Sequence, residues 1–188
     1  MASIISPFTR PQMATARPNN FPIPKKDTSR TGNLKKFEVK IEKQTIRTKI
    51  IEETISRVNA INIEEGDILV SAGRGIGNKE NLELVQELAQ EINGLMASSR
   101  ALVELGWTSH PIQVGQSGKT VSPKLYIALG ISGKIQYLVG MKSSDIIVAV
   151  NTDPEAPIFN VADFGIVGDI FEIIPQFLKK LRSERKKY

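Results

Sequence analysis

The chain has 188 residues, 40% of them hydrophobic, which suits one domain with a core and an appendage. It has no cysteine and one histidine, which excludes disulfides, thiolate metal sites, cysteine nucleophiles and histidine-rich metal clusters. The net charge of +5 is uneven: residues 1–62 carry 12 basic and 5 acidic side chains, and residues 63–188 carry 13 and 15. A nucleic-acid-binding module normally has its basic face on the folded part, so we expect no nucleic-acid partner. No apolar run approaches the roughly 20 residues of a membrane-spanning helix, so we expect no direct membrane insertion.

The N-terminal 33 residues contain five prolines and no acidic side chain before Asp27. An arginine-bearing, acid-poor N-terminus is also typical of a mitochondrial transit peptide, but such peptides form amphipathic helices, which the prolines oppose. We therefore interpret residues 1–33 as an extended connector. The β-branched residues within 36–56 favour edge strands.

Beyond residue 66, short apolar runs alternate with segments of helical periodicity. Strands are predicted at residues 67–72, 95–97 and 125–129, in a run ending at Asn151, and within 163–168. Helices are predicted from an Asn78 cap to about Ile92, at 98–105, after Gly133, and from Asp169 onward, where Pro175 should kink or restart the helix. A polar loop is expected at 106–123. The alternation predicts an α/β fold with a doubly wound, mostly parallel, Rossmann-like sheet and an extended N-terminal segment.

The most informative stretch is the predicted strand–helix–strand unit of residues 125–151. Its first apolar run stops at a glycine, the small polar pair Ser132-Gly133 follows, and a helical pattern leads to the second run. A helix that begins at such a pair offers free N–H groups and the positive end of its dipole to a phosphate. The unit therefore predicts a site for a nucleotide-like cofactor.

Other short motifs are less specific. The turn of residues 73–77 does not fit G-x-G-x-x-G, because its third glycine would fall at Asn78, so an ordinary turn and a cofactor turn both remain open. Arg74 favours the second, since an arginine there can reach a phosphate or a flavin. Residues 116–120 resemble a P-loop, but Gln113 stands where the first glycine is needed, which excludes nucleotide triphosphate hydrolysis. Ser99 and Arg100 fit helix capping and ligand contact equally well.

No nucleophile–base arrangement, metal cluster or spaced carboxylate pair is present in the sequence. A cofactor turn without reactive side chains is typical of proteins in which the cofactor itself carries the chemistry.

Six motifs in this order resemble the C-terminal, FAD-binding half of the electron transfer flavoprotein alpha subunit. They are residues 10–18, 73–75, 99–101, 113–119, 132–136 and 153–159. The resemblance covers roughly residues 10–180. It implies a deoxyhypusine synthase-like NAD/FAD-binding fold, with residues 1–33 as the inter-domain connector and 34–188 as the FAD-binding domain. It also implies one noncovalent FAD, no catalytic side chain and no metal.

The resemblance assigns roles to groups of residues. Arg74 and Arg100 would lie against the flavin, Gln116 and Ser117 near its N5 and carbonyl edge, and residues 132–136 beside the flavin edge, ribityl chain and pyrophosphate. Asn151 and Asp169 would lie at the adenosine end. The full predicted cofactor-binding set is Arg74, Gly75, Ser99, Arg100, Gln113, Val114, Gly115, Gln116, Ser117, Ser132, Gly133, Lys134, Ile135, Gln136, Tyr137, Asn151, Asp169 and Ile170.

The chain departs from the family pattern in three ways. It lacks the family's N-terminal domain, so we expect a fragment, an excised domain or a truncated reading frame. Tyr137 stands where histidine is usual beside the flavin O2; a tyrosine donates a hydrogen bond there but brings no positive charge. Ser117 replaces a threonine and keeps the hydroxyl.

The resemblance implies an electron carrier rather than an enzyme acting alone. A beta subunit would complete a heterodimer that passes electrons from acyl-CoA dehydrogenases of fatty acid oxidation, or from ferredoxin/NADH systems, to an acceptor such as a quinone reductase. We expect a prokaryotic cytoplasm rather than a mitochondrial matrix. A pyridine-nucleotide enzyme of related fold and an interaction fragment without cofactor remain alternatives.

Overall fold

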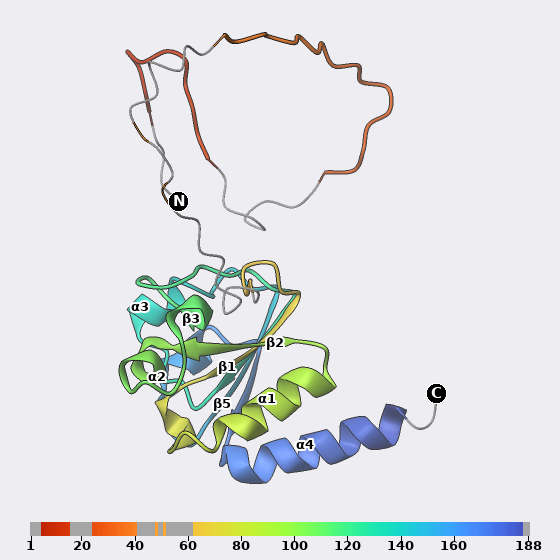
Figure 1. The fold of residues 1–188 in the computed structure, drawn as a ribbon. Coiled ribbons are helices and arrows are strands. Elements are labelled where there is room, and N and C mark those ends of the chain that lie inside the picture. The colour runs from red at the N-terminus through yellow and green to blue at the C-terminus, as the bar shows by residue number, and fades with distance from the viewer. Residues whose placement is uncertain (1–4, 16–23, 41–47, 49–50, 52–61, 186–188) are drawn as a thin grey trace. The chain divides into compact units, whose positions relative to one another are not determined.

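The computed structural model describes residues 5–15, 24–40, 48, 51 and 62–185 (Figure 1). The chain divides into two units, Pro22–Ala60 and the combination of Met1–Phe21 with Ile61–Tyr188. The described residues of Pro22–Ala60 contain no helix or strand. The edge strands expected within 36–56 are absent at 36–40, where Phe37 and Val39 are exposed and no strand pairs with them. The rest of that prediction, apart from residues 48 and 51, which are also not in a strand, lies outside the described residues.

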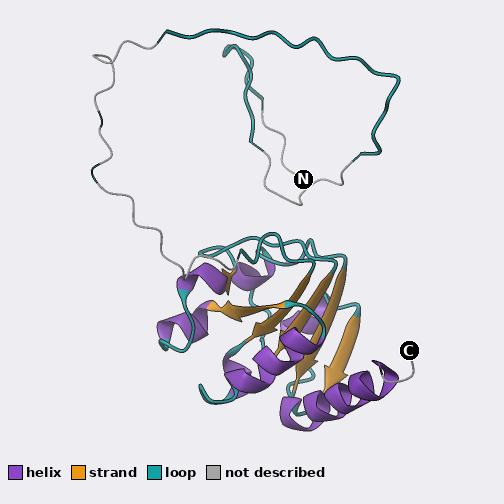
Figure 2. Ribbon diagram, turned by 45° about the vertical axis from the view of Figure 1, so that its right-hand side comes forward, coloured by secondary structure: helices purple, strands orange, loops and turns teal. Residues whose placement is uncertain are grey.

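Six strands of the described chain form one parallel sheet in the order β3-β2-β1-β4-β5-β6 (Figure 2). They are β1 (Ile68–Ala72), β2 (Leu95–Ser99), β3 (Gln113–Val114), β4 (Leu125–Leu129), β5 (Ile146–Asn151) and β6 (Phe164–Val167). This confirms the predicted α/β, doubly wound, Rossmann-like fold, and the sheet is parallel throughout rather than mostly so.

Four α-helices connect and cover these strands. They are α1 (Leu82–Glu91), α2 (Arg100–Glu104), α3 (Ile135–Leu138) and α4 (Ile170–Arg185), with 3₁₀ turns η3 (Arg74–Ile76), η4 (His110–Ile112) and η5 (Pro157–Asn160) between them. The two long helices, α1 and α4, lie side by side (Figure 1). Right-handed crossovers run in opposite directions on the two sides of β1 and β4, which distributes the connecting elements over both faces.

The two faces of the sheet bury separate apolar clusters. Side chains of α1, α2 and α4 pack with Val70, Leu129 and neighbours on what we call the helix face. The opposite face, which we call the loop face, is covered by α3, η5 and the segment around Val114 and Val121. The alternation of each strand decides the face, so Leu69 and Val70 enter different clusters.

Several predicted boundaries were wrong. Helix α1 begins at Leu82 and not at Asn78, because the Asn78 Oδ1 accepts the Asn81 N–H and closes a turn before the helix. Strand β2 continues to Ser99, so α2 is shorter than predicted. The expected loop of residues 106–123 contains β3, which is held by its pairing with β2.

Of the two outcomes expected at Pro175, a kink or a restart, the restart does not occur, and α4 is one helix through this position. Proline lacks one N–H donor, but its exposed position allows water to bond to the carbonyl left without a partner. The apolar stripe of Ile170, Ile174 and Leu178 continues on both sides of it, and its burial on the helix face holds the two halves together.

Candidate functional site

The strand order reverses between β1 and β4, which makes the loops after these two strands a topological switch point. In open α/β sheets, ligands bind outside the carboxyl ends of the strands at such a point. Most of the eighteen predicted residues lie in the loops or first helical turns that follow the strands, and Ser99, Gln113, Val114 and Asn151 lie at the carboxyl ends of β2, β3 and β5. The parallel sheet therefore brings the set to one edge, although the side chains there do different things.

The loops after β1 and β4 touch through their backbones. The Gly73 N–H donates to the Leu129 carbonyl at 2.8 Å and the Gly75 N–H to the Gly130 carbonyl at 2.9 Å. A Cβ on Gly73 would lie 2.3 Å from the Gly130 oxygen, and one on Gly75 would lie 2.7 Å from the Gly130 Cα. Close packing of two loops thus accounts for glycine at 73 and 75. Between them Arg74 is exposed, and the described residues offer it no ion pair.

The turn after β4 contains consecutive backbone N–H groups without acceptors in the described residues. Within the described residues, the backbone N–H groups of 132–136 donate no hydrogen bond. Gly133 has φ of +82°, and its Cα faces the η5 backbone so closely that a Cβ would lie 2.3 Å from the Ile158 nitrogen. The Ser132 carbonyl accepts the Ile158 N–H at 3.1 Å. These contacts fix a turn in which Ser132, Lys134, Ile135 and Gln136 are exposed, so undonated amides and a cation lie at the surface, as an anionic ligand requires.

The loop after β3 is braced from within. The buried Gln113 side chain donates to the Ser117 Oγ at 3.1 Å, and the backbone carbonyl of Gln113 accepts the Lys119 N–H at 2.8 Å. Gln116 donates its backbone N–H to the Gln136 carbonyl at 2.7 Å, which joins this loop to α3.

The members of the loop after β3 therefore differ in exposure. Val114 and Gly115 are buried, the former in the loop-face cluster and the latter against the backbone of α3. The side chains of Gln116 and Ser117 are exposed. Gln113 and Val114 shape the loop, and Gln116 and Ser117 present polar groups from it.

The end of β2 presents two polar side chains. Arg100 donates from Nε to the Glu104 Oε1 at 2.7 Å along its own helix, and both side chains are mostly exposed. The Ser99 Oγ is buried and finds no hydrogen-bond partner among the residues that the structure describes. A buried hydroxyl without a partner is uncommon in folded proteins and fits a position that a ligand completes.

The remaining predicted residues make visible internal contacts. The Asn151 amide donates to the Ile131 carbonyl at 2.8 Å, and its Oδ1 accepts the Asp153 N–H at 3.0 Å, so it ties the loops after β4 and β5 together. The Asp169 Oδ1 accepts the Phe171 N–H at 2.8 Å at the start of α4, and Ile170 is buried in the helix-face cluster. These contacts explain why these residue types suit these positions without a ligand.

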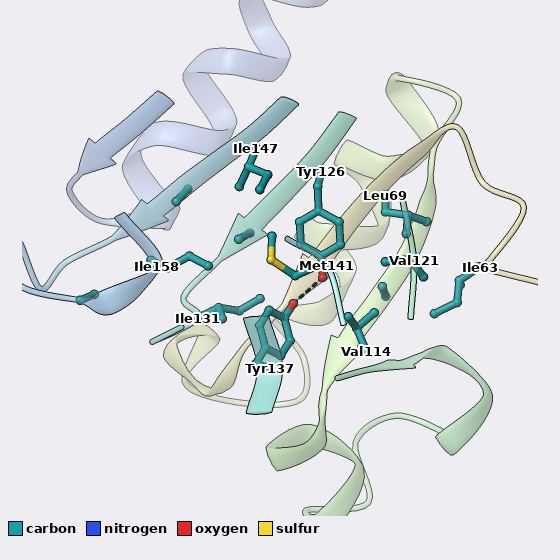
Figure 3. Packing of buried hydrophobic residues seen from close by; sticks show 14 residues of the cluster. Ile63, Leu69, Val114, Val121, Tyr126, Ile131, Tyr137, Met141, Ile147 and Ile158 are labelled. Atoms are coloured by element: carbon teal, nitrogen blue, oxygen red, sulfur yellow. Dashed lines mark hydrogen bonds between the residues drawn. The ribbon is translucent and has the colours of Figure 1, made fainter. Parts of the chain in front are cut away.

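Tyr137 points inward. Its ring is buried in the loop-face cluster, and its hydroxyl hydrogen-bonds to the Tyr126 hydroxyl (Figure 3). The same hydroxyl also hydrogen-bonds to the Ser71 Oγ at 2.8 Å. Burial raises the pKa of both tyrosines well above its ordinary value. Sequence reasoning missed Ser71 and Tyr126, although each is a hydroxyl within an apolar strand run, on the same strand face as its apolar i±2 neighbours.

Other kinds of site find little support in the described chain. No group of three or more histidine, cysteine or acidic residues within it could hold a metal ion. None of its helices is long and apolar enough to span a bilayer. A hollow between α1 and α4, lined by Leu84, Pro175, Leu178 and Arg182 among others, contains no residue of the loops at the switch point.

The sheet order and the open amides at the switch point define the class as a Rossmann-like domain of dinucleotide-binding type. Residues 62–142 match the family model described as the electron transfer flavoprotein FAD-binding domain. The chain is 48% identical over 183 residues to the electron transfer flavoprotein subunit alpha of Thermoanaerobacterium thermosaccharolyticum, covering 97% of this chain and 56% of the relative. It is 47% identical to Protein FixB of Clostridium saccharobutylicum, covering 97% and 54%.

A third relative is subunit LctC of the lactate dehydrogenase (NAD(+),ferredoxin) of Acetobacterium woodii, 39% identical over 97% of this chain and 44% of the relative. The chain spans about half the length of these curated relatives. The resemblance to the electron transfer flavoprotein alpha subunits that its motifs indicated is thereby confirmed, over nearly the whole of this chain.

Proposed function

We propose that this protein binds one FAD noncovalently in a domain of residues 34–188 and carries electrons as part of an alpha/beta heterodimer. The observation that supports this best is the row of undonated N–H groups at residues 132–136, at the switch point of a sheet that matches a flavoprotein family. Backbone donors of this kind suit a pyrophosphate.

The residues at the edge of the sheet fit the parts of the cofactor. The turn at 132–136 would hold the pyrophosphate, with the exposed cation of Lys134 in the same turn and that of Arg74 in the adjoining loop after β1. The orphan Ser99 hydroxyl and the exposed side chains of Gln116 and Ser117 supply hydrogen-bonding groups for the polar edge of the ring. When bound, the flavin supplies one- or two-electron transfer, and no side chain of the chain needs to act as nucleophile or base.

Arg100 would tune the cofactor. Only the Nε of its guanidinium is engaged in the described residues, by Glu104, so the other nitrogens remain available to a ligand. A positive charge near the pyrimidine side of a flavin favours the reduced form and raises the reduction potential.

The partners are part of the same proposal. We propose an electron transfer flavoprotein beta subunit, with acyl-CoA dehydrogenase-type or ferredoxin/NADH-linked donors and an acceptor such as a quinone reductase. The name of the LctC relative, which includes NAD(+) and ferredoxin, supports the second kind of donor. The relatives compared are bacterial, which supports the prokaryotic cytoplasm that we expected.

The test is a titration of the purified chain with FAD, with and without a beta subunit, followed by quenching of flavin fluorescence. We expect saturable binding and a visible flavin spectrum. An NADH titration with the same readout runs in parallel. Binding of NADH in place of FAD, or of neither nucleotide under both conditions, would contradict the proposal.

Two variants sharpen the test. Arg74→Ala should weaken FAD binding about tenfold, the effect of losing a charge-assisted contact of about 1.4 kcal/mol. Arg100→Ala should lower the flavin potential with little loss of stability, and an unchanged potential would place Arg100 away from the ring. Lys124→Ala is the control, because Lys124 pairs with Asp67 at the amino ends of β4 and β1 and should change neither quantity.

A further inference from the structure

Three hydroxyl groups meet inside the loop face, beneath the proposed cofactor loops. Ser71 comes from β1, Tyr126 from β4 and Tyr137 from α3. The Tyr137 hydroxyl hydrogen-bonds to the Tyr126 hydroxyl (Figure 3) and to the Ser71 Oγ at 2.8 Å. Tyr126 and Ser71 are fully buried, and Tyr137 is 8% exposed. Strands β1 and β4 flank the switch point, so the hydroxyl of Tyr137 attaches α3 to both sides of it.

Helix α3 needs such an attachment. It contains only the four residues Ile135–Leu138, and a helix of one turn has no stability of its own in water. Its first residue, Ile135, is 76% exposed and Gln136 is exposed as well. Tyr137 is the residue of α3 that is buried in the core. Tyr137 is therefore the buried anchor of α3, and it places the helix end of the turn at 132–136, whose other end is held by the contacts of Ser132 and Gly133 with η5.

The attachment extends to a second loop. The Gln136 carbonyl, adjacent to Tyr137, accepts the Gln116 N–H at 2.7 Å. A Cβ on Gly115 would lie 3.1 Å from the same Gln136 oxygen, so the loop after β3 packs directly on α3. A shift of α3 would move Gln116 together with the open amides of 132–136.

We propose that Tyr137 is a positioning residue, whose hydroxyl, held by Ser71 and Tyr126, sets the relative placement of the 132–136 and 115–117 loops toward the cofactor without touching the cofactor itself. This inference rests on the proposed function, and it replaces the expectation that the Tyr137 hydroxyl donates to the flavin. With both of its neighbours engaged inside the core, the hydroxyl has no donor directed outward.

The experiment compares Tyr137→Phe with Tyr126→Phe. Each change removes one buried hydroxyl and leaves the ring, so the two variants lose similar packing and polar contacts. Only the first releases α3, because in Tyr126→Phe the Tyr137 hydroxyl keeps its bond to Ser71. Urea unfolding measures the stability of both variants.

Two readouts are compared in the full chain. In Tyr137→Phe we expect the FAD dissociation constant to rise about fivefold, the equivalent of one net hydrogen bond, and Tyr126→Phe to change it less than about twofold. The visible circular dichroism of bound FAD should change in the first variant alone. Hydrogen exchange of the cofactor-free proteins should be faster at residues 115–118 and 132–138 in the first variant alone.

The outcomes separate the possibilities. Equal effects of the two variants, or no effect of either, would overturn the inference, because Tyr137 would then act through core stability or not at all. Weaker FAD binding in Tyr137→Phe without faster exchange would overturn it too, by indicating direct contact with the cofactor. If Tyr137→Phe does not fold, the double variant Ser71→Ala/Tyr126→Phe, which removes both partners of the Tyr137 hydroxyl, should show the same two changes, and their absence would count against the inference. If wild type binds no FAD, the proposed function fails, while hydrogen exchange still decides whether Tyr137 orders the loops.

Discussion

The two faces of the sheet differ in what holds them. On the helix face, α1 and α4, of 10 and 16 residues, cover an apolar cluster that includes Leu88, Leu129 and Ile174. On the loop face, α3 has four residues, and the cluster contains two tyrosine hydroxyls. Apolar burial stabilises both faces, and on the loop face directional hydrogen bonds and close backbone contacts are added to it. The face that needs accurate geometry is the one that carries the proposed cofactor loops.

The largest expected effect is a loss of stability from a cavity in the helix-face cluster. Leu88 of α1 is fully buried, and Leu88→Ala should lower the free energy of unfolding by about 3 kcal/mol, through lost burial and the cavity left behind. The FAD affinity of the folded protein should remain that of wild type. Urea unfolding and a flavin titration measure the two quantities. Gln90→Ala, at an exposed position of the same helix, is the control and should change neither; a change in affinity for Leu88→Ala alone would mean that the two faces are not independent.

The next largest expected effect is a loss of stability from a substitution at the Gly133 turn on the loop face. Gly133→Ala should cost about 2 to 3 kcal/mol, since it adds the strain of a positive φ to a clash with the Ile158 backbone. Gly106 also has positive φ but has open space around its Cα, so Gly106→Ala should cost only about 1 kcal/mol. Thermal unfolding compares the two, and FAD binding should weaken in the first only. Equal costs would show that the contact with η5 relaxes easily.

The third prediction concerns the buried tyrosines. Unfolded tyrosine loses its proton near pH 10, whereas burial raises the pKa of Tyr126 and Tyr137 in the folded chain. Their contribution is complete below about pH 10, and above it stability should fall by about 1.4 kcal/mol per pH unit for each tyrosine. Urea unfolding at pH 8, 10 and 11 measures the slope. A Tyr126→Phe/Tyr137→Phe double variant shares every other titrating group and should lose this part of the slope; parallel profiles would contradict the assignment.

The smallest expected effect is on stability, and it tests the ion pairs between α1 and α4 on the helix face. Glu91 of α1 accepts hydrogen bonds from Arg182 and Arg185 of α4 and is 17% exposed. Glu91→Gln should cost about 0.5 to 1 kcal/mol at low salt, and the difference should shrink in 1 M NaCl because salt screens such pairs. Glu155→Gln, an exposed carboxylate without an ion pair in the described residues, should show no salt-dependent loss. A loss at Glu91 that salt does not change would indicate packing rather than charge.

The sequence predicted the strands well where apolar runs are continuous. Residues 67–72 and 125–129 coincide closely with β1 and β4 because both faces of these strands are buried. It failed for β3, whose two residues form a strand only because Ser98 and Ser99 pair with them. The start of α1 was misplaced because an asparagine turn before a helix has the same local pattern as a helix cap.

The site was predicted as a set of positions but not as a set of roles. The carboxyl ends of parallel strands meet at one edge of a sheet, so the structure brings most of the predicted positions together there, and their contact with a cofactor stays a prediction. The roles depend on contacts between segments far apart in the chain. Gln113 and Asn151 brace loops from inside, and Ser71 and Tyr126, 66 and 11 residues away from Tyr137, were not among the predicted residues at all.

The sequence by itself determined the alternation of strands and helices, the family and the polar turn at Ser132-Gly133, because these depend on local periodicity and on residues close together in the chain. Only the tertiary structure decided the strand order, the direction in which Tyr137 points and the reason for glycine at 73, 75 and 133. Each of these features depends on contacts between segments of the fold that lie far apart in the sequence.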